Sequence, residues 1–133
     1  DRVVFDKTGT LTLGRPLVTS VWAKDAALLL QLAASLEQSS RHPLAHALLQ
    51  EAQRRDLTLL EPVQVTTVSG QGLVGEVEGW PQPIRVGRPD WLGSFGVALS
   101  DEARTWLAQA AGSVVAVAHG SALLGLVQIE DQI

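Results

Sequence analysis

The pattern of apolar and polar residues predicts two consecutive helices in the first half of the chain. Apolar residues recur at three- and four-residue spacing over residues 25–39, and Asp25 is suited to cap the first turn. The polar residues at 39–42 break this pattern, and Pro43 suits the first position of a second helix, 43–55. The two segments therefore predict a helical hairpin.

Short β-prone segments separated by turns make up most of the remaining chain. They lie at residues 17–22, 63–68, 73–77, 84–86, 114–118 and 123–129. A third helix is expected at 101–111 with Ser100 as its cap, and a loop with a short helix at 87–93. Strands joined by short turns pair antiparallel, and the helices should cover one face of the sheet. The expected fold class is α/β (α+β): an antiparallel β-sheet of about six strands flanked by helical hairpins.

One uncharged stretch, residues 107–129, is long enough to cross a bilayer as a helix. Polar residues interrupt it at Gln109, Ser113, His119, Ser121 and Gln128. A turn-like segment at 118–121 also separates its two β-prone runs. We therefore predict two buried strands here rather than a transmembrane helix.

Composition restricts the classes of partner. The 133 residues are 46% hydrophobic and 18% charged, as in one globular domain, and the formal net charge is −4. The sequence has no Lys/Arg-rich block, so we expect no nucleic-acid partner. It has no cysteine, which excludes disulfides and thiolate metal sites. An anion such as ATP remains compatible with this charge, because local N–H groups and one or two cations decide its binding.

The sequence Asp-Lys-Thr-Gly-Thr-Leu-Thr at residues 6–12 carries the strongest chemical signal and follows a short apolar, strand-like run. Asp6 is placed to attack a γ-phosphate and become an acyl phosphate. Lys7 would add a cation beside the transferred group, whose oxygens the turn from Thr8 to Thr10 can hold. A strand followed by a polar turn is the purely structural alternative, which seven such consecutive residues disfavour.

This heptapeptide resembles the phosphorylation motif of P-type ATPases, the ion pumps that pass through an aspartyl-phosphate intermediate. Aspartyl phosphatases of a related fold carry a second Asp, as general acid and base, two residues after the nucleophile, where this chain has Thr8. Because a hydroxyl cannot serve as a base near neutral pH, the acyl phosphate should persist. A persistent intermediate suits a pump better than a phosphatase.

A second motif, Ser-Arg-His-Pro-Leu-Ala at residues 40–45, resembles the Ser-Glu-His-Pro-Leu-Ala signature of heavy-metal-transporting P-type ATPases. The resemblance implies that His42 positions adenine in a nucleotide-binding domain, and that Glu37, five residues earlier, belongs to the same site. A carboxylate can accept the adenine amino group, and an imidazole offers a flat face. A helix-capping role is the alternative for His42. Arg41 departs from the Glu of the signature and adds positive charge.

Two further segments resemble the nucleotide-binding domain of these pumps. The Gly-Gln-Gly-Leu-Val-Gly run at 70–75 precedes a predicted strand, which argues against a dinucleotide-binding fold. The resemblance implies that Gly70 and Gly72 let the backbone approach the nucleotide, with an ordinary hairpin turn as the alternative. The segment at 87–92 resembles a Gly-Asn-x-x-Trp-Leu pattern, with Arg88 in place of Asn. An arginine could reach a phosphate bidentately.

The other histidines are expected to bind no metal. His46 lies on the same helical face as His42, at a spacing that can hold a metal ion, but no third ligand accompanies the pair. His119 falls in a predicted turn and should be solvated. We therefore predict no metal-binding residues.

The order of motifs implies three segments: a phosphorylation-domain remnant at 1–12, a nucleotide-binding domain at 13–121 and a re-entry strand at 122–133. The resemblance implies a cytoplasmic domain of an integral membrane pump for heavy-metal ions, copper foremost. ATP, with Mg²⁺ bridging its phosphates, would bind in the intact pump, whose other domains and a soluble metallochaperone are the implied partners. The fragment should be monomeric and should bind but not hydrolyse ATP, because it lacks the family's Gly-Asp-Gly-x-Asn-Asp motif.

Three alternatives remain at this stage. An aspartyl phosphatase, or a P-type pump of another ion branch, would share the motif at 6–12, but the His42–Pro43 pair argues against both. An interaction domain that uses its Leu- and Ala-rich helices would bind no nucleotide. A nucleotide titration separates this last alternative from the others.

Overall fold

The computed structural model describes residues 15–40 and 42–132. The motif at 6–12, with Asp6, Lys7 and Thr8, lies outside the described residues, as does Arg41.

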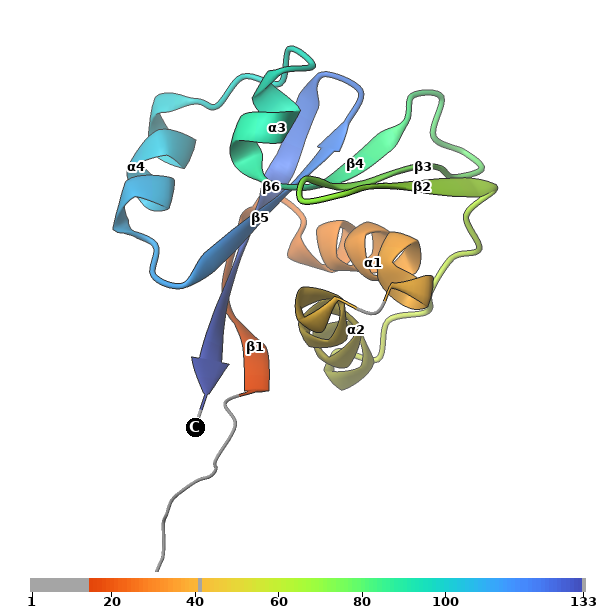
Figure 1. The fold of residues 1–133 in the computed structure, drawn as a ribbon, viewed down its shortest axis with the longest axis horizontal. Coiled ribbons are helices and arrows are strands. Elements are labelled where there is room, and N and C mark those ends of the chain that lie inside the picture. The colour runs from red at the N-terminus through yellow and green to blue at the C-terminus, as the bar shows by residue number, and fades with distance from the viewer. Residues whose placement is uncertain (1–14, 41, 133) are drawn as a thin grey trace, which may run out of the picture.

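A single antiparallel sheet of six strands forms the centre of the fold (Figure 1). Its strands are β1 (Arg15–Ala23), β2 (Gln64–Val68), β3 (Gly72–Glu76), β4 (Ile84–Gly87), β5 (Ser113–His119) and β6 (Ala122–Gln132). They are ordered β1-β6-β5-β4-β3-β2, and every neighbouring pair is antiparallel. The expected antiparallel sheet is therefore confirmed.

The uncharged stretch at 107–129 forms the end of a helix and two paired strands, β5 and β6, as predicted. Among the residues that the structure describes, no helix is long and apolar enough to cross a membrane.

The helices are α1 (Ala26–Leu36), α2 (Pro43–Arg54), α3 (Pro89–Gly93) and α4 (Asp101–Gln109), with a short 3₁₀ helix, η1 (Glu37–Ser39), between the first two. Both predicted caps are present. The Asp25 carboxylate accepts the Leu28 N–H at 3.1 Å, and the Ser100 hydroxyl accepts the Ala103 N–H at 3.1 Å. Such caps satisfy N–H groups that the first helical turn leaves without partners.

The helices cover both faces of the sheet, not one face as the sequence had led us to expect. On β5, Val115 and Val117 pack with the helical pair α1–α2, whereas Ala116 and Ala118 belong to a second core beneath α3 and α4. Figure 1 shows the two helical groups on opposite sides of the central strands. The physical reason is the two-residue period of a strand: a continuous apolar run has a buried face on each side.

Residues 122–132 form β6, which lies in the same sheet as the other five strands. β6 pairs with β5 over Ser113–His119 and with β1 over Arg15–Ala23. The expected boundary at 121/122 falls at the turn between β5 and β6. The division of the chain into domains stays a prediction.

The prediction that His119 is solvated in a turn was wrong. The residue is half-buried at the end of β5. Its Nε2 accepts the Gln82 N–H at 3.1 Å, and its ring meets Trp80 edge-on with the ring centroids 4.8 Å apart. The pairing of Ile84 with His119 brings these distant segments together. His119 therefore links the end of β5 to the loop between β3 and β4.

Candidate functional site

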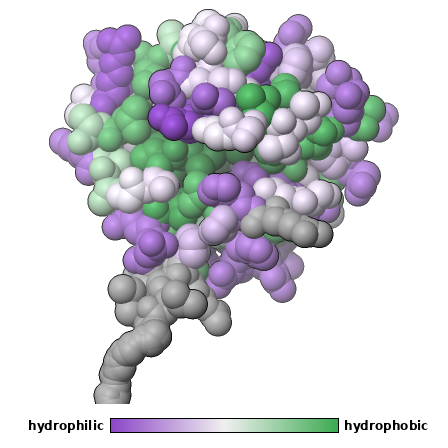
Figure 2. All heavy atoms as spheres, in the orientation of Figure 1, coloured by the Kyte–Doolittle hydropathy of each residue, from purple (hydrophilic) through white to green (hydrophobic). Residues whose placement is uncertain are grey.

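A cavity of about 720 Å³ lies between the elbow of α1 and α2 on one side and α3 with the start of β5 on the other. Apolar side chains from three adjacent strands, Leu73, Val86 and Val115, line it, and all three belong to the core beneath α1 and α2. In the orientation of Figure 1, apolar residues occupy the middle of the visible face and hydrophilic residues surround them (Figure 2). A cavity of this size and mixed lining suits a small organic ligand.

Glu37 enters the cavity from the point where α1 ends. It is the first residue of η1, its backbone N–H donates to the carbonyl of Ala33, and it is 8% exposed. Burial raises the pKa of the Glu37 carboxyl group to about 7, an effect that the Ser40 hydroxyl partly offsets. A carboxyl group kept out of water with few partners is suited to exchange hydrogen bonds with a ligand.

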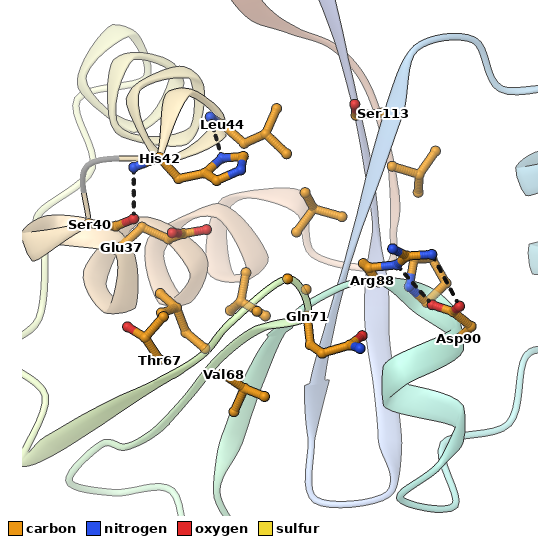
Figure 3. Close-up of a pocket in the computed structure, with 18 of the residues that line it drawn as sticks. Glu37, Ser40, His42, Leu44, Thr67, Val68, Gln71, Arg88, Asp90 and Ser113 are labelled. Carbon is orange, nitrogen blue, oxygen red and sulfur yellow. Dashed lines mark hydrogen bonds and ion pairs between the residues drawn. The ribbon is translucent and has the colours of Figure 1, made fainter.

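His42 lies across the elbow from Glu37, at the N-cap of α2 (Figure 3). Its Nδ1 accepts the Leu44 N–H at 3.2 Å, so the capping role weighed as the alternative is present. In the neutral ring the proton must then be on Nε2. His42 also lines the cavity and is exposed. The same imidazole can therefore cap α2 through one nitrogen and donate to a ligand through the other.

Both predicted glycines line the cavity, and a different structural constraint favours glycine at each position. Gly70 has a φ of +77°, a conformation that suits glycine, and a Cβ there would point into open space. At Gly72 a Cβ would lie 2.2 Å from the Val86 carbonyl oxygen and 3.0 Å from the Trp91 ring. Close packing of β3 against β4 is therefore sufficient to require glycine at 72, whether or not a ligand approaches it.

Arg88 and Asp90 form the opposite end of the cavity, at the start of α3 (Figure 3). The Arg88 Nε and Nη2 donate to the two carboxylate oxygens of Asp90 at 3.3 and 3.4 Å. The side chains are 62% and 72% exposed, respectively. Arg88, the candidate residue at this end, therefore already has an acidic partner. The sequence analysis did not predict this ion pair with Asp90.

All five candidate residues that the structure describes, Glu37, His42, Gly70, Gly72 and Arg88, line this one cavity. Sequence reasoning missed further lining residues, which include Thr67, Gln71, Gly112 and Ser113 as well as Asp90. A signal existed for Asp90 and Gln71, which lie inside quoted motifs. Gly112 and Ser113 belong to no motif, and only the pairing of β5 with β4 brings them here.

The arrangement provides different chemistry at its two ends. The elbow offers a buried hydrogen-bonding carboxyl group and an imidazole above an apolar floor, which suits a planar heterocycle. The other end offers an exposed guanidinium, which suits an anion. Within residues 15–40 and 42–132, no group of three or more His, Asp or Glu residues could hold a metal ion.

A family model for haloacid dehalogenase-like hydrolases matches residues 1–133, the whole chain. The chain belongs to the haloacid dehalogenase-like hydrolase family. Among its curated relatives is a copper-exporting P-type ATPase of Vibrio cholerae, 41% identical over 137 residues, which cover 100% of the chain. A zinc-exporting P-type ATPase of Mycobacterium marinum is 34% identical over 140 residues and also covers 100% of the chain.

Solved structures agree with this assignment. The N-domain of HMA6, a copper-transporting P-type ATPase, has a TM-score of 0.73 at 24% identity and covers 87% of this chain and 99% of its own, which supports the fold. The catalytic domain of the CPx-ATPase CopB-B, studied for conformational changes upon nucleotide binding, has a TM-score of 0.64 at 28% identity. It covers 95% of this chain and 40% of its own. The resemblance to heavy-metal P-type ATPases is thereby confirmed.

The chain spans only part of these pumps: 15% of the Vibrio cholerae protein and 19% of the Mycobacterium marinum protein. These relatives are P-type ATPases, the enzyme class predicted, and the chain matches one segment of such an enzyme.

Proposed function

We propose that this chain is the ATP-binding domain of a heavy-metal-transporting P-type ATPase, and that its cavity holds the adenosine of ATP. The observation that carries the proposal is the meeting of Glu37 and His42 at one end of a partly apolar cavity of about 720 Å³. The likeness to the CopB-B catalytic domain, whose conformation changes upon nucleotide binding, supports it.

Adenine fits the elbow end of the cavity in shape and in hydrogen bonding. The Glu37 carboxylate accepts a hydrogen bond from the exocyclic amino group, and the His42 Nε2–H donates to a ring nitrogen or presents its flat face. The apolar floor formed by Leu73, Val86 and Val115 removes the base from water. Guanine would place an oxygen where adenine has its amino group, so Glu37 disfavours GTP.

The ribose and phosphates extend from the elbow toward Arg88. The turn at Gly70 leaves open space in which a ligand can approach the backbone, and Gly72 continues this surface. Arg88 provides the cation nearest the far end of the cavity among its lining residues. Recognition is therefore directed mainly at the adenosine, which leaves the γ-phosphate free for transfer.

The transfer itself is proposed to involve the motif at 6–12. The Asp6 carboxylate would form a bond to the γ-phosphorus while the bond to the β-phosphate oxygen breaks and ADP leaves, with Lys7 and Thr8 supporting the transferred oxygens. A Mg²⁺ ion bound with the ATP would lower the negative charge of the phosphates. The fragment alone should bind ATP without hydrolysing it, because in-line attack needs a firmly aligned nucleophile and metal. Steady phosphate release by the purified chain, at rates usual for enzymes, would contradict this part of the proposal.

Copper is the transported ion that we propose, because the relative with 41% identity exports copper whereas the zinc exporter is 34% identical. The chain would then be a cytoplasmic domain of an integral membrane pump, working with the pump's other domains and receiving its ion from a soluble metallochaperone.

The test is calorimetric titration of the purified chain with ATP. Glu37→Ala and His42→Ala should each weaken binding by about 1–3 kcal/mol, since each leaves a polar group of the bound nucleotide without its partner. Glu78→Ala, which removes an exposed carboxylate outside the cavity, is the matched control and should bind as wild type does. Unchanged affinity in both cavity variants would refute the adenine site, and no saturable binding by wild type would favour the nucleotide-free interaction domain.

A further inference from the structure

The ion pair between Arg88 and Asp90 lines the cavity and is held by long hydrogen bonds. Its two hydrogen bonds, 3.3 and 3.4 Å long, exceed the usual 2.7–2.9 Å of a charge-assisted contact. Both side chains are largely exposed, at 62% and 72%, and exposed pairs of this kind are weak. The guanidinium can therefore leave its partner easily when a stronger anion arrives.

The two partners are not equally free to move. The Asp90 Oδ1 also accepts the Trp91 N–H at 2.9 Å, which fixes the carboxylate against the first turn of α3. The backbone N–H of Arg88 donates to the Gln71 carbonyl oxygen at 3.0 Å, which fixes its Cα beside the glycine turn. The long Arg88 side chain is the movable part, and it starts from a backbone anchored at the proposed nucleotide site.

We propose that Asp90 is a specificity-determining residue that competes with the nucleotide phosphates for Arg88. This inference rests on the proposed function. In the empty cavity Asp90 holds the guanidinium; when a nucleotide binds, Arg88 exchanges this carboxylate for a phosphate oxygen. The freed Asp90 charge then remains near the phosphate chain and repels it, so the gain from each added phosphate is small.

This arrangement limits how tightly ATP binds without affecting adenine recognition. The two charges stand at the opposite end of the cavity from Glu37 and His42 (Figure 3). Neutralising Asp90 should therefore strengthen the binding of ATP and ADP, which carry several negative charges, and leave AMP almost unchanged. An Asn at 90 retains an oxygen for the Trp91 N–H, so Asp90→Asn removes the charge while preserving this turn.

The experiment measures the affinities of AMP, ADP and ATP, without Mg²⁺ and at fixed ionic strength, for wild type and Asp90→Asn. We expect Asp90→Asn to raise ATP affinity roughly three- to tenfold, the size of an exposed like-charge repulsion and a weak competing pair. AMP affinity should change less than about twofold by the same reasoning. Asp56→Asn is the matched control, because Asp56 is exposed, lies outside the cavity and has a φ of 60° that Asn tolerates.

A second pair of variants assigns the effect to Arg88. In an Arg88→Gln background, Asp90→Asn should raise ATP affinity by a clearly smaller factor, because no guanidinium is released. An unchanged ATP affinity in Asp90→Asn, an equal gain for AMP and ATP, or the same gain without Arg88 would each overturn the inference while the adenosine site stands. Absence of saturable binding by every nucleotide to wild type would instead overturn the proposed function itself.

Discussion

The two ends of the cavity place their charged groups in opposite environments. At the elbow, Glu37 is 8% exposed, and burial raises the pKa of its carboxyl group to about 7. At the α3 end, the Arg88 and Asp90 side chains are 62% and 72% exposed and pair weakly through solvent-screened contacts. The comparison contrasts a carboxyl group whose burial disfavours its charge with an exposed ion pair that contributes little.

The difference has a physical consequence for selectivity. A buried carboxyl group without its ligand destabilises the fold, so it discriminates strongly between ligands that satisfy it and ligands that do not. An exposed ion pair exchanges partners at little cost and adjusts affinity in small steps. We therefore expect the elbow to select the base and the α3 end to adjust the response to phosphate charge.

The largest expected effect is on stability at the elbow. The raised pKa of Glu37 means that the unfolded chain ionises this group first, so the folded state loses stability as the pH rises from 4.5 to about 7. Glu37→Gln should remove this loss. Its unfolding free energy should exceed that of wild type by about 3 kcal/mol at pH 8 and should be almost the same at pH 4. Urea unfolding at both pH values measures it.

The control for this prediction is Glu78→Gln, which replaces an exposed carboxylate outside the cavity. Its unfolding free energy should follow that of wild type at each pH. Equal stability of Glu37→Gln and wild type at pH 8 would contradict the claim that the ionised Glu37 destabilises the fold.

The next effect is on binding and comes from the same carboxyl group. The ionised Glu37 carboxylate accepts the adenine amino group more strongly than the neutral acid does, so adenosine affinity should rise, by up to about tenfold, from pH 6 to pH 8 around a pKa of about 7. Adenosine is chosen because it has no phosphate to titrate. The ratio to Glu37→Gln at each pH isolates this group from all others, and a ratio that falls with rising pH would show that the carboxyl group donates instead.

His42 allows its two roles to be separated. His42→Ala removes the cap on α2 and should lower the unfolding free energy by about 1 kcal/mol. His42→Asn keeps a capping oxygen, and its unfolding free energy should stay within a few tenths of a kcal/mol of wild type. Both variants should lose ATP affinity, because neither has an imidazole. Full recovery of ATP binding in His42→Asn would mean that His42 acts on the nucleotide only through the helix.

The smallest effect is expected at the exposed end. Arg88→Gln breaks a weak surface pair and should change the unfolding free energy by less than about 1 kcal/mol, as measured by urea denaturation. A loss as large as the pH-dependent effect at Glu37 would show that the α3 end is structural after all, and would remove the contrast between the two ends.

Local patterns in the sequence were sufficient for most of the fold. The caps at Asp25 and Ser100 act within one helical turn, and the antiparallel pairing follows from short turns. The covering of both faces was missed, although the apolar run in β5 contained the information. Val115 and Ala116 point to opposite sides, and each requires its own apolar neighbours.

The elbow end of the candidate site was predictable because its two residues lie close together in the sequence. Glu37 and His42 flank a single elbow, so proximity in sequence implied proximity in space. Asp90 was missed as a partner because its contact with Arg88 depends on the first turn of α3. The role of His119 depends on Gln82, which is 37 residues distant and meets it only through strand pairing.

The most direct test of the central claim, that ATP binds between the elbow and the α3 end, is a chemical-shift titration of the ¹⁵N-labelled chain with ATP. The account predicts saturable shifts that include the amides of Glu37, His42 and Gly70, with little change at Gly79 and Trp80, which lie outside the cavity. Shifts confined to the region of Gly79 and Trp80, or no saturable shift at all, would contradict it.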